Sequence, residues 1–146
     1  MSTNFQQRKA FLADLEYILE QARAFRDYVR SGTKKELERH PFEQIIHNAL
    51  LESSLSFLRK INEFFGGHRE ASVCLFLPDY PRQWLWDQAD SDLLNERVMH
   101  LSLCEAREGK LDWAAFYSAH LPEAERRFDE FLLTLNDKHP EYFQQG

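Results

Sequence analysis

The stretch from residue 41 to residue 67 constrains the fold most, because it is the longest segment in which apolar residues recur at helical spacing. One face of such a helix carries Phe42, Ile46, Leu50, Phe57, Ile61 and Phe64, and the face is widened by Leu51, Leu55, Leu58 and Phe65. A helix this apolar needs neighbours on several sides. We therefore predict that the helix of residues 42–65 is the innermost element of the fold, beginning at Pro41 and ending at Gly66 and Gly67.

A narrow polar stripe remains on the same predicted helix. It holds Asn48, Glu52, Arg59 and Glu63, which are spaced four, seven and four residues apart and so line up along one edge. We expect this edge to face the edge of the third helix that carries Arg97, His100 and Arg107.

Composition places the chain among helical, single-domain proteins. Its 146 residues suffice for one core without disulfides, and 43% hydrophobic residues with twelve Phe argue against disorder. Five Gly, five Pro and few valines favour helix over sheet. We predict an all-α fold, an antiparallel bundle of four main helices with short extra turns, over residues 1–146, with residues 1–4 and 138–146 as frayed tails.

Charge and cysteine content limit the function classes. A net charge of −6 argues against a chain built mainly to coat nucleic acid, although a local basic face remains open. Cys74 and Cys104 lack metal-ligand spacing, which fits a reduced protein. No signal-peptide core and no membrane-spanning segment is found in the sequence, so we expect a cytoplasmic protein with no membrane association.

The remaining helices follow from periodicity and end signals. The first should cover residues 4–30, with a core line of Phe11, Leu15, Ile18, Ala22, Phe25 and Val29. Thr33 and Glu36 form a capping box for a short turn over residues 33–40. The third main helix should cover residues 92–110, capped by Ser91 or Asp90, with the core line Leu94, Val98, Leu101 and Cys104.

The end of the chain leaves one alternative open. Residues 113–120 and 122–137 both have helical patterns, and Pro122 either divides one helix or begins a second. Ala124, Phe128, Phe131 and Leu135 form the predicted core line there. Between the second and third helices, residues 68–90 form an irregular loop, in which Phe76, Trp84 and Trp86 are expected to plug the end of the bundle.

The third helix carries the one candidate catalytic cluster. Arg97, His100 and Arg107 lie within roughly 80° of one another around a helix. Neighbouring guanidinium groups disfavour a protonated histidine and leave it able to act as a base, while arginine binds phosphate. This chemistry suits cleavage of RNA phosphodiesters. The alternative is a half-buried structural His100 whose arginine neighbours pair with acidic residues, namely Glu96, Glu105 or Glu52. No metal site and no cofactor is expected.

The segments NALLESSLSFLRKINEFFGG, LLNERVMHLSLCEAR and KLDWAAFY resemble small bacterial proteins whose helices are similar to HEPN domains. The resemblance covers roughly residues 41–131 and rests on Leu50 to Ser53, Arg59, Phe64, His100 to Ser102, Arg107 and Trp113. It implies a helical bundle that dimerises and, in active members, a metal-independent ribonuclease. In those members an arginine stands four to six residues before a histidine. Many belong to toxin–antitoxin or phage-defence systems.

The arginine-to-histidine spacing of that family is not reproduced here. Asn95 stands where the family pattern has arginine with four residues intervening, and Arg97 stands three residues before His100. We expect Arg97 or Arg107 to take that role, with Glu52, Arg59 and Asn95 orienting or neutralising the cluster. The first function hypothesis is an RNA-binding or RNA-cleaving homodimer, in which an antitoxin is one expected partner. The second is a non-catalytic protein-interaction module with a degenerate site.

Overall fold

The structure is a computed structural model of the chain that describes residues 4–30, 41–67, 69–94 and 113–145. Its long helices are α1 (Phe5–Arg30), α3 (Glu43–Gly66) and α5 (Trp113–Lys138), and its 3-10 turns are η1 (Val73–Leu75) and η2 (Pro140–Tyr142). Residues 88–94 are also helical. The described ranges contain no strand, so the fold is all-α as predicted.

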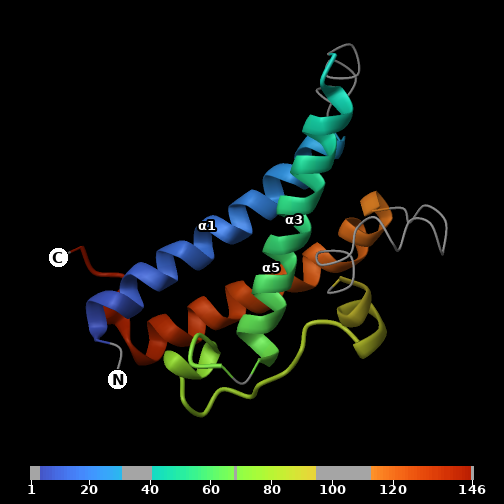
Figure 1. The fold of residues 1–146 in the computed structure, drawn as a ribbon. Coiled ribbons are helices and arrows are strands. Elements are labelled where there is room, and N and C mark those ends of the chain that lie inside the picture. Colours follow the sequence, from blue (N-terminus) through green and yellow to red (C-terminus); the bar gives the residue numbers. More distant parts are fainter. Residues whose placement is uncertain (1–3, 31–40, 68, 95–112, 146) are drawn as a thin grey trace.

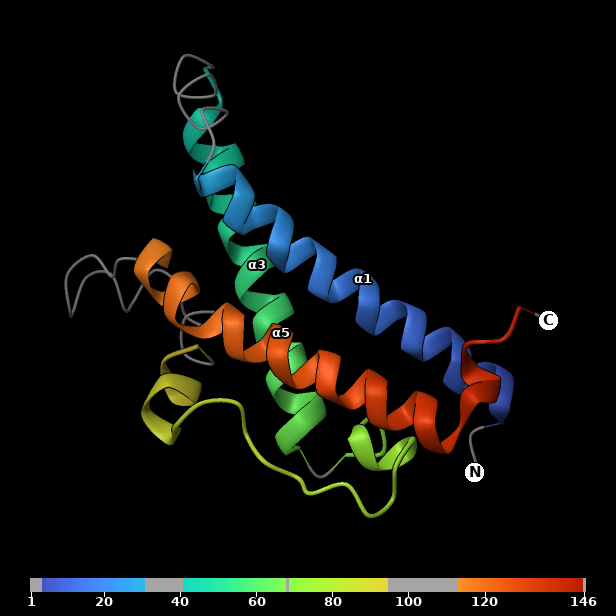
Figure 2. The ribbon, with the colours of Figure 1, turned by 180° about the vertical axis from the view of Figure 1, so that it is seen from behind.

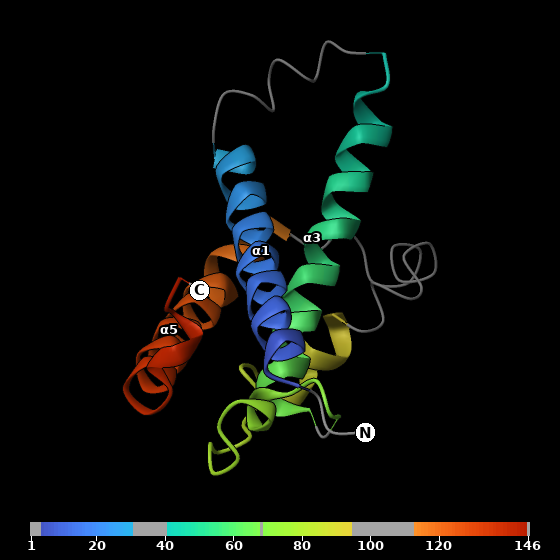
Figure 3. The same cartoon turned by 90° about the vertical axis from the view of Figure 1, so that its left-hand side faces the viewer.

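The three long helices form an antiparallel bundle. α1 and α3 run in opposite directions, and α5 runs back past α1 (Figures 1 and 2). The view from the side shows α1 with α5 on one side and α3 on the other (Figure 3), and α3 and α5 also contact each other. The start of α1 and the end of α5 therefore meet at the same end of the bundle. Within the described residues, no helix is both long enough and apolar enough to cross a membrane.

α1 begins at a reciprocal cap. The backbone N–H of Gln7 donates to Asn4 Oδ1 at 2.9 Å, and that of Asn4 donates to Gln7 Oε1 at 3.0 Å. The buried face consists of Leu12, Leu15, Leu19, Ala22 and Phe25. The predicted line is thus correct at three positions, whereas Phe11 and Ile18 are only half-buried. The reason is that α1 contacts α5 as well as α3. The buried face of α1 is therefore centred between two adjacent rows of side chains and does not follow the single predicted row.

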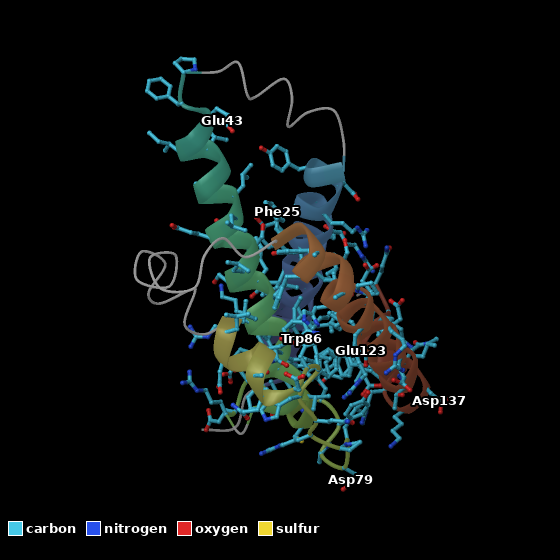
Figure 4. All side chains as sticks on the ribbon, turned by 90° about the vertical axis from the view of Figure 1, so that its right-hand side faces the viewer. Phe25, Glu43, Asp79, Trp86, Glu123 and Asp137 are labelled. Atoms are coloured by element: carbon cyan, nitrogen blue, oxygen red, sulfur yellow. The ribbon has the colours of Figure 1, made fainter. Side chains whose placement is uncertain are left out.

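α3 is central only over its later turns. Leu55, Leu58 and Phe65 are fully buried, whereas Ile45 is 67% exposed and Leu50 is 38% exposed. Phe42, at 59% exposure, precedes the helix, which starts at Glu43 rather than Pro41. The first turns project beyond the bundle, where Glu43 marks the tip (Figures 1 and 4). The prediction of a buried face over all of residues 42–65 is therefore wrong for its first third, because the described neighbours cover only the later turns.

The segment that follows α3 closes the lower end of the bundle. Phe76 and Trp86 are buried as predicted, but Trp84 is 41% exposed. Its indole lies flat over Gly66, where an added Cβ would come within 2.3 Å of Trp84 Cδ2. The helical residues 88–94 start earlier than predicted, because Asp87 Oδ1 accepts the backbone N–H of Asp90 at 2.8 Å. Asp87, and neither Asp90 nor Ser91, is the N-cap.

The structure of α5 shows which of the two alternatives at Pro122 is correct. The proline is exposed and lies inside one continuous helix. The predicted core line of Ala124, Phe128, Phe131 and Leu135 is buried throughout. After the helix, Tyr142 is 6% exposed and packs on the core, so the prediction that residues 138–146 are frayed is wrong at this point. In the third predicted helix Leu94 is buried as expected, while Val98, Leu101 and Cys104 lie outside the described residues.

Candidate functional site

The predicted cluster falls on a segment that the structure does not describe. Arg97, His100, Arg107 and the supporting Asn95 all lie within residues 95–112, outside the described residues. Of the other two supporting residues, Glu52 is exposed on α3 and Arg59 is half-buried on the same helix. Arg59 is therefore the predicted residue from which a described site can be built.

Arg59 lines a pocket of about 380 Å³ between α1 and α3. The floor is apolar: α1 contributes Phe11, Leu15 and Ile18, which are spaced four and three residues apart on one face, and α3 contributes Phe64. The size lies within the range of small-molecule pockets. A mainly apolar floor of this kind favours a ligand with a flat or aliphatic body.

The pocket rim is basic. Arg59 and Lys60 come from α3, and Arg69 comes from the segment just after it. None of these three cations has an ion-pair partner among the described residues. Other arginines do have such partners: Arg23 pairs with Glu125 at 3.1 Å, and Arg126 pairs with Glu123 at 2.7 Å. Cations that have no ion-pair partner in the described part of the chain, placed at the edge of an apolar pocket, suit an anionic group.

Two further polar side chains face the same space. Ser56 and Glu63 lie one turn before and one turn after Arg59 on α3. A Cβ added at Gly67 would come within 2.9 Å of Glu63 Oε2, so this carboxylate lies against the backbone at the end of the helix. The pocket therefore offers one carboxylate and one hydroxyl besides three cations.

The later part of the polar stripe predicted on α3 faces α1. Arg59 and Glu63 open into the α1–α3 pocket, whereas residues 88–94 meet α3 at Asn62, about 60° further round the helix from Arg59. Asn62 Nδ2 donates to Ser91 Oγ at 3.1 Å, and Asn62 Oδ1 accepts the backbone N–H of Leu85 at 2.9 Å. A buried amide, absent from the predicted stripe, therefore holds the start of the third helix.

A histidine–carboxylate pair lies at the junction of that segment with α5. His120 Nε2 is 3.0 Å from Asp90 Oδ2, and the imidazole contacts the rings of Trp86 and Phe116 at 5.2 and 4.4 Å between centroids. Trp86, which lies between the segment and α5 in Figure 4, donates its Nε1–H to the His120 carbonyl at 3.3 Å. Because the imidazole is held by a carboxylate and by two aromatic rings, we interpret the pair as a structural clasp.

Sequence reasoning missed most of the pocket. The sequence shows Lys60 and Arg69 as basic residues near Arg59, but their convergence with Phe11 depends on how α1 crosses α3.

Among the described residues, no group of three His, Cys, Asp or Glu side chains lies close enough together to hold a metal ion. Cys74 is half-buried and accepts a hydrogen bond from Arg82 Nε at 3.2 Å.

Comparison with models of known protein families, with curated proteins and with solved structures finds no significant match to this chain.

Proposed function

We propose that this protein binds RNA, as a helical protein of the HEPN type. The observation that supports the proposal is the α1–α3 pocket, whose rim carries three cations without ion-pair partners among the described residues. RNA offers phosphates to these cations and flat bases to the apolar floor. The basic character is local, since the whole chain has a net charge of −6.

RNA affinity measured over a range of salt concentrations tests this proposal. The double variant Arg59→Ala/Arg69→Ala should bind a single-stranded RNA more weakly, and the slope of log affinity against log salt should fall by about 1.4, since each lost phosphate contact contributes about 0.7. The matched control is Arg126→Ala/Lys138→Ala, which removes the same charge from α5, away from the pocket. Equal loss in both variants would contradict binding at the pocket.

The resemblance to HEPN proteins extends this proposal to RNA cleavage at His100, assisted by Arg97 and Arg107. A ribonuclease would fit a toxin–antitoxin or defence system, working as a homodimer with an antitoxin as partner. RNA degradation and growth arrest on expression should be lost in His100→Ala and kept in His139→Ala. His139 is a suitable control because its described ion-pair partner is Glu141, at 3.2 Å, near the chain end. Identical behaviour of both variants and the wild type would rule out catalysis by His100.

A second candidate function is a protein-interaction module. It is favoured by the projecting tip of α3, where Ile45 and Leu50 are exposed apolar residues. A second copy of the chain or another protein would cover them. Self-association of the wild type, measured by sedimentation, should be lost in Ile45→Ser/Leu50→Ser and retained in Leu133→Ser, which alters an exposed leucine on α5. A monomeric wild type would remove the homodimer from this proposal.

A further inference from the structure

We infer that the α1–α3 pocket takes one unpaired nucleotide of a single-stranded RNA, with its phosphate at Arg59 and Arg69 and its base against Phe11. The inference rests on the proposed RNA-binding function and goes beyond it, because it specifies strandedness and the contacts of a single base. RNA bound through its phosphates alone would need neither the floor nor an unpaired base.

The size of the pocket limits its occupant. A volume of about 380 Å³ lies near the lower end of the range for small-molecule pockets. The pocket can therefore hold one nucleotide but is too small for a segment of duplex RNA. Bases in a duplex are stacked and paired inside the helix, so only an unpaired base can turn into a pocket of this kind.

The floor provides a fixed aromatic surface. The Phe11 ring lies 6.1 Å from that of Phe76 at an interplanar angle of 13°, and it meets the Phe64 ring edge-on at 6.2 Å. Phe11 is itself half-buried and lines the pocket. The rings of Phe64 and Phe76 thus hold the Phe11 ring in place. A base that stacks on Phe11 therefore binds a side chain that is already ordered, which lowers the entropic cost of binding.

The polar groups favour a nucleotide over an aliphatic acid. Arg59 is half-buried and Arg69 is exposed. Each guanidinium group can bind two oxygens of one phosphate at once. Ser56 and Glu63 face the same space and can pair with ribose hydroxyls or with amino groups on a base edge. An aliphatic carboxylate would satisfy the cations but would make no use of the Ser56 and Glu63 side chains.

Fluorescence of 2-aminopurine placed once in a short RNA tests the contact with the base. Binding of the single strand to the wild-type protein should change that fluorescence, and the same sequence annealed to its complement should bind at least about tenfold more weakly. Phe11→Leu should lower the single-strand affinity at least about fivefold, since stacking on an aromatic side chain contributes roughly 1–3 kcal/mol per base. The control Tyr17→Leu alters an exposed ring on the same helix and should leave the affinity unchanged.

The outcomes separate this inference from the proposed function. If RNA binds with the predicted salt dependence but the duplex binds equally well, or Phe11→Leu has no effect, RNA binding stands and the single-nucleotide site is wrong. If no RNA binds and decanoate instead protects the protein against heat in a manner that requires Arg59, both are wrong and the pocket holds an aliphatic acid. Adenosine monophosphate competing with the single strand, where inorganic phosphate and adenosine each compete more weakly, would support the site.

Discussion

The side chain of Tyr117 places a hydroxyl group in the core of the bundle. Its Oη atom is buried and has no hydrogen-bond partner among the described residues. Ser54, on α3, donates its own proton to the Leu50 carbonyl at 2.6 Å. Burial raises the pKa of Tyr117 far above its usual range, and the Ser54 hydroxyl offsets this only in part. The phenol is therefore neutral in the folded protein well beyond neutral pH.

Tyr117→Phe should give a protein about as stable as the wild type at neutral pH, because the geometry shows no hydrogen-bond partner for the lost hydroxyl among the described residues. Above pH 10 the unfolded chain releases the Tyr117 proton while the folded chain keeps it, so the unfolded state binds fewer protons and stability falls as pH rises. The variant lacks this loss of up to about 1.4 kcal/mol per pH unit. Urea unfolding at pH 8 and pH 11 measures the difference, with the exposed Tyr17→Phe as control. A constant difference between wild type and Tyr117→Phe would contradict it.

Asn62 shows how one buried amide positions a whole segment. It is 4% exposed and bonds to Leu85 and Ser91 on the chain that follows α3. Asn62→Ala would leave the Leu85 N–H without its acceptor, so we expect a loss of about 1–3 kcal/mol in unfolding free energy. Chemical denaturation of this variant should be compared with Asn136→Ala, an exposed position on α5. A loss equal to that of the control would mean that the amide does not hold the segment.

The two ends of α3 contribute differently to stability. Leu55 is fully buried in the later turns, while Leu50, five residues earlier, is 38% exposed. Leu55→Ala should cost about 2–5 kcal/mol, whereas Leu50→Ala should cost less than about 1 kcal/mol. Thermal unfolding of the matched pair measures both. Equal shifts would mean that the tip of α3 is covered in solution, as by a second copy of the chain.

Helical periodicity predicted the elements well and their surroundings less well. The spacing of apolar residues correctly located α1, α3 and the core line of α5, since that spacing follows from burial on one face. It could not predict that the first turns of α3 extend past their neighbours, because an apolar stripe looks the same whether or not another helix covers it. Asp87 was missed as a cap because Asp90 and Ser91 offer the same side-chain chemistry nearby.

The candidate site was predictable only in part, because its residues come from three segments. Arg59 was singled out from the polar stripe of α3, since that stripe is a local property of one helix. Phe11 and Arg69 join it only through the crossing of α1 and α3, which no local pattern encodes. The pairing of His120 with Asp90 joins residues thirty positions apart and likewise depends on the fold.

At the scale of the whole molecule, the end of the chain secures the start of α1. The Tyr142 ring lies 4.9 Å from that of Phe5 and 5.6 Å from that of Phe76, and Lys9 Nζ donates to the Gln144 carbonyl at 2.8 Å. Polar residues around Tyr142 suggested a frayed tail, but its ring fills a space left between α1, η1 and α5. Tyr142 therefore belongs to the core.

Tyr142→Ala should consequently destabilise the whole bundle, by about 3–5 kcal/mol, as expected when a buried aromatic side chain is truncated. The neighbouring Phe143→Ala is the matched control, because Phe143 is 40% exposed and its loss should cost less than about 1 kcal/mol. Urea unfolding gives both free energies, and hydrogen exchange of the first turns of α1 reports whether they open when Tyr142 is removed. If Tyr142→Ala unfolds at the wild-type midpoint, with unchanged exchange in α1, the end of the chain does not contribute to the core. A cooperative loss across both probes is the result expected of a bundle whose first and last elements share one core.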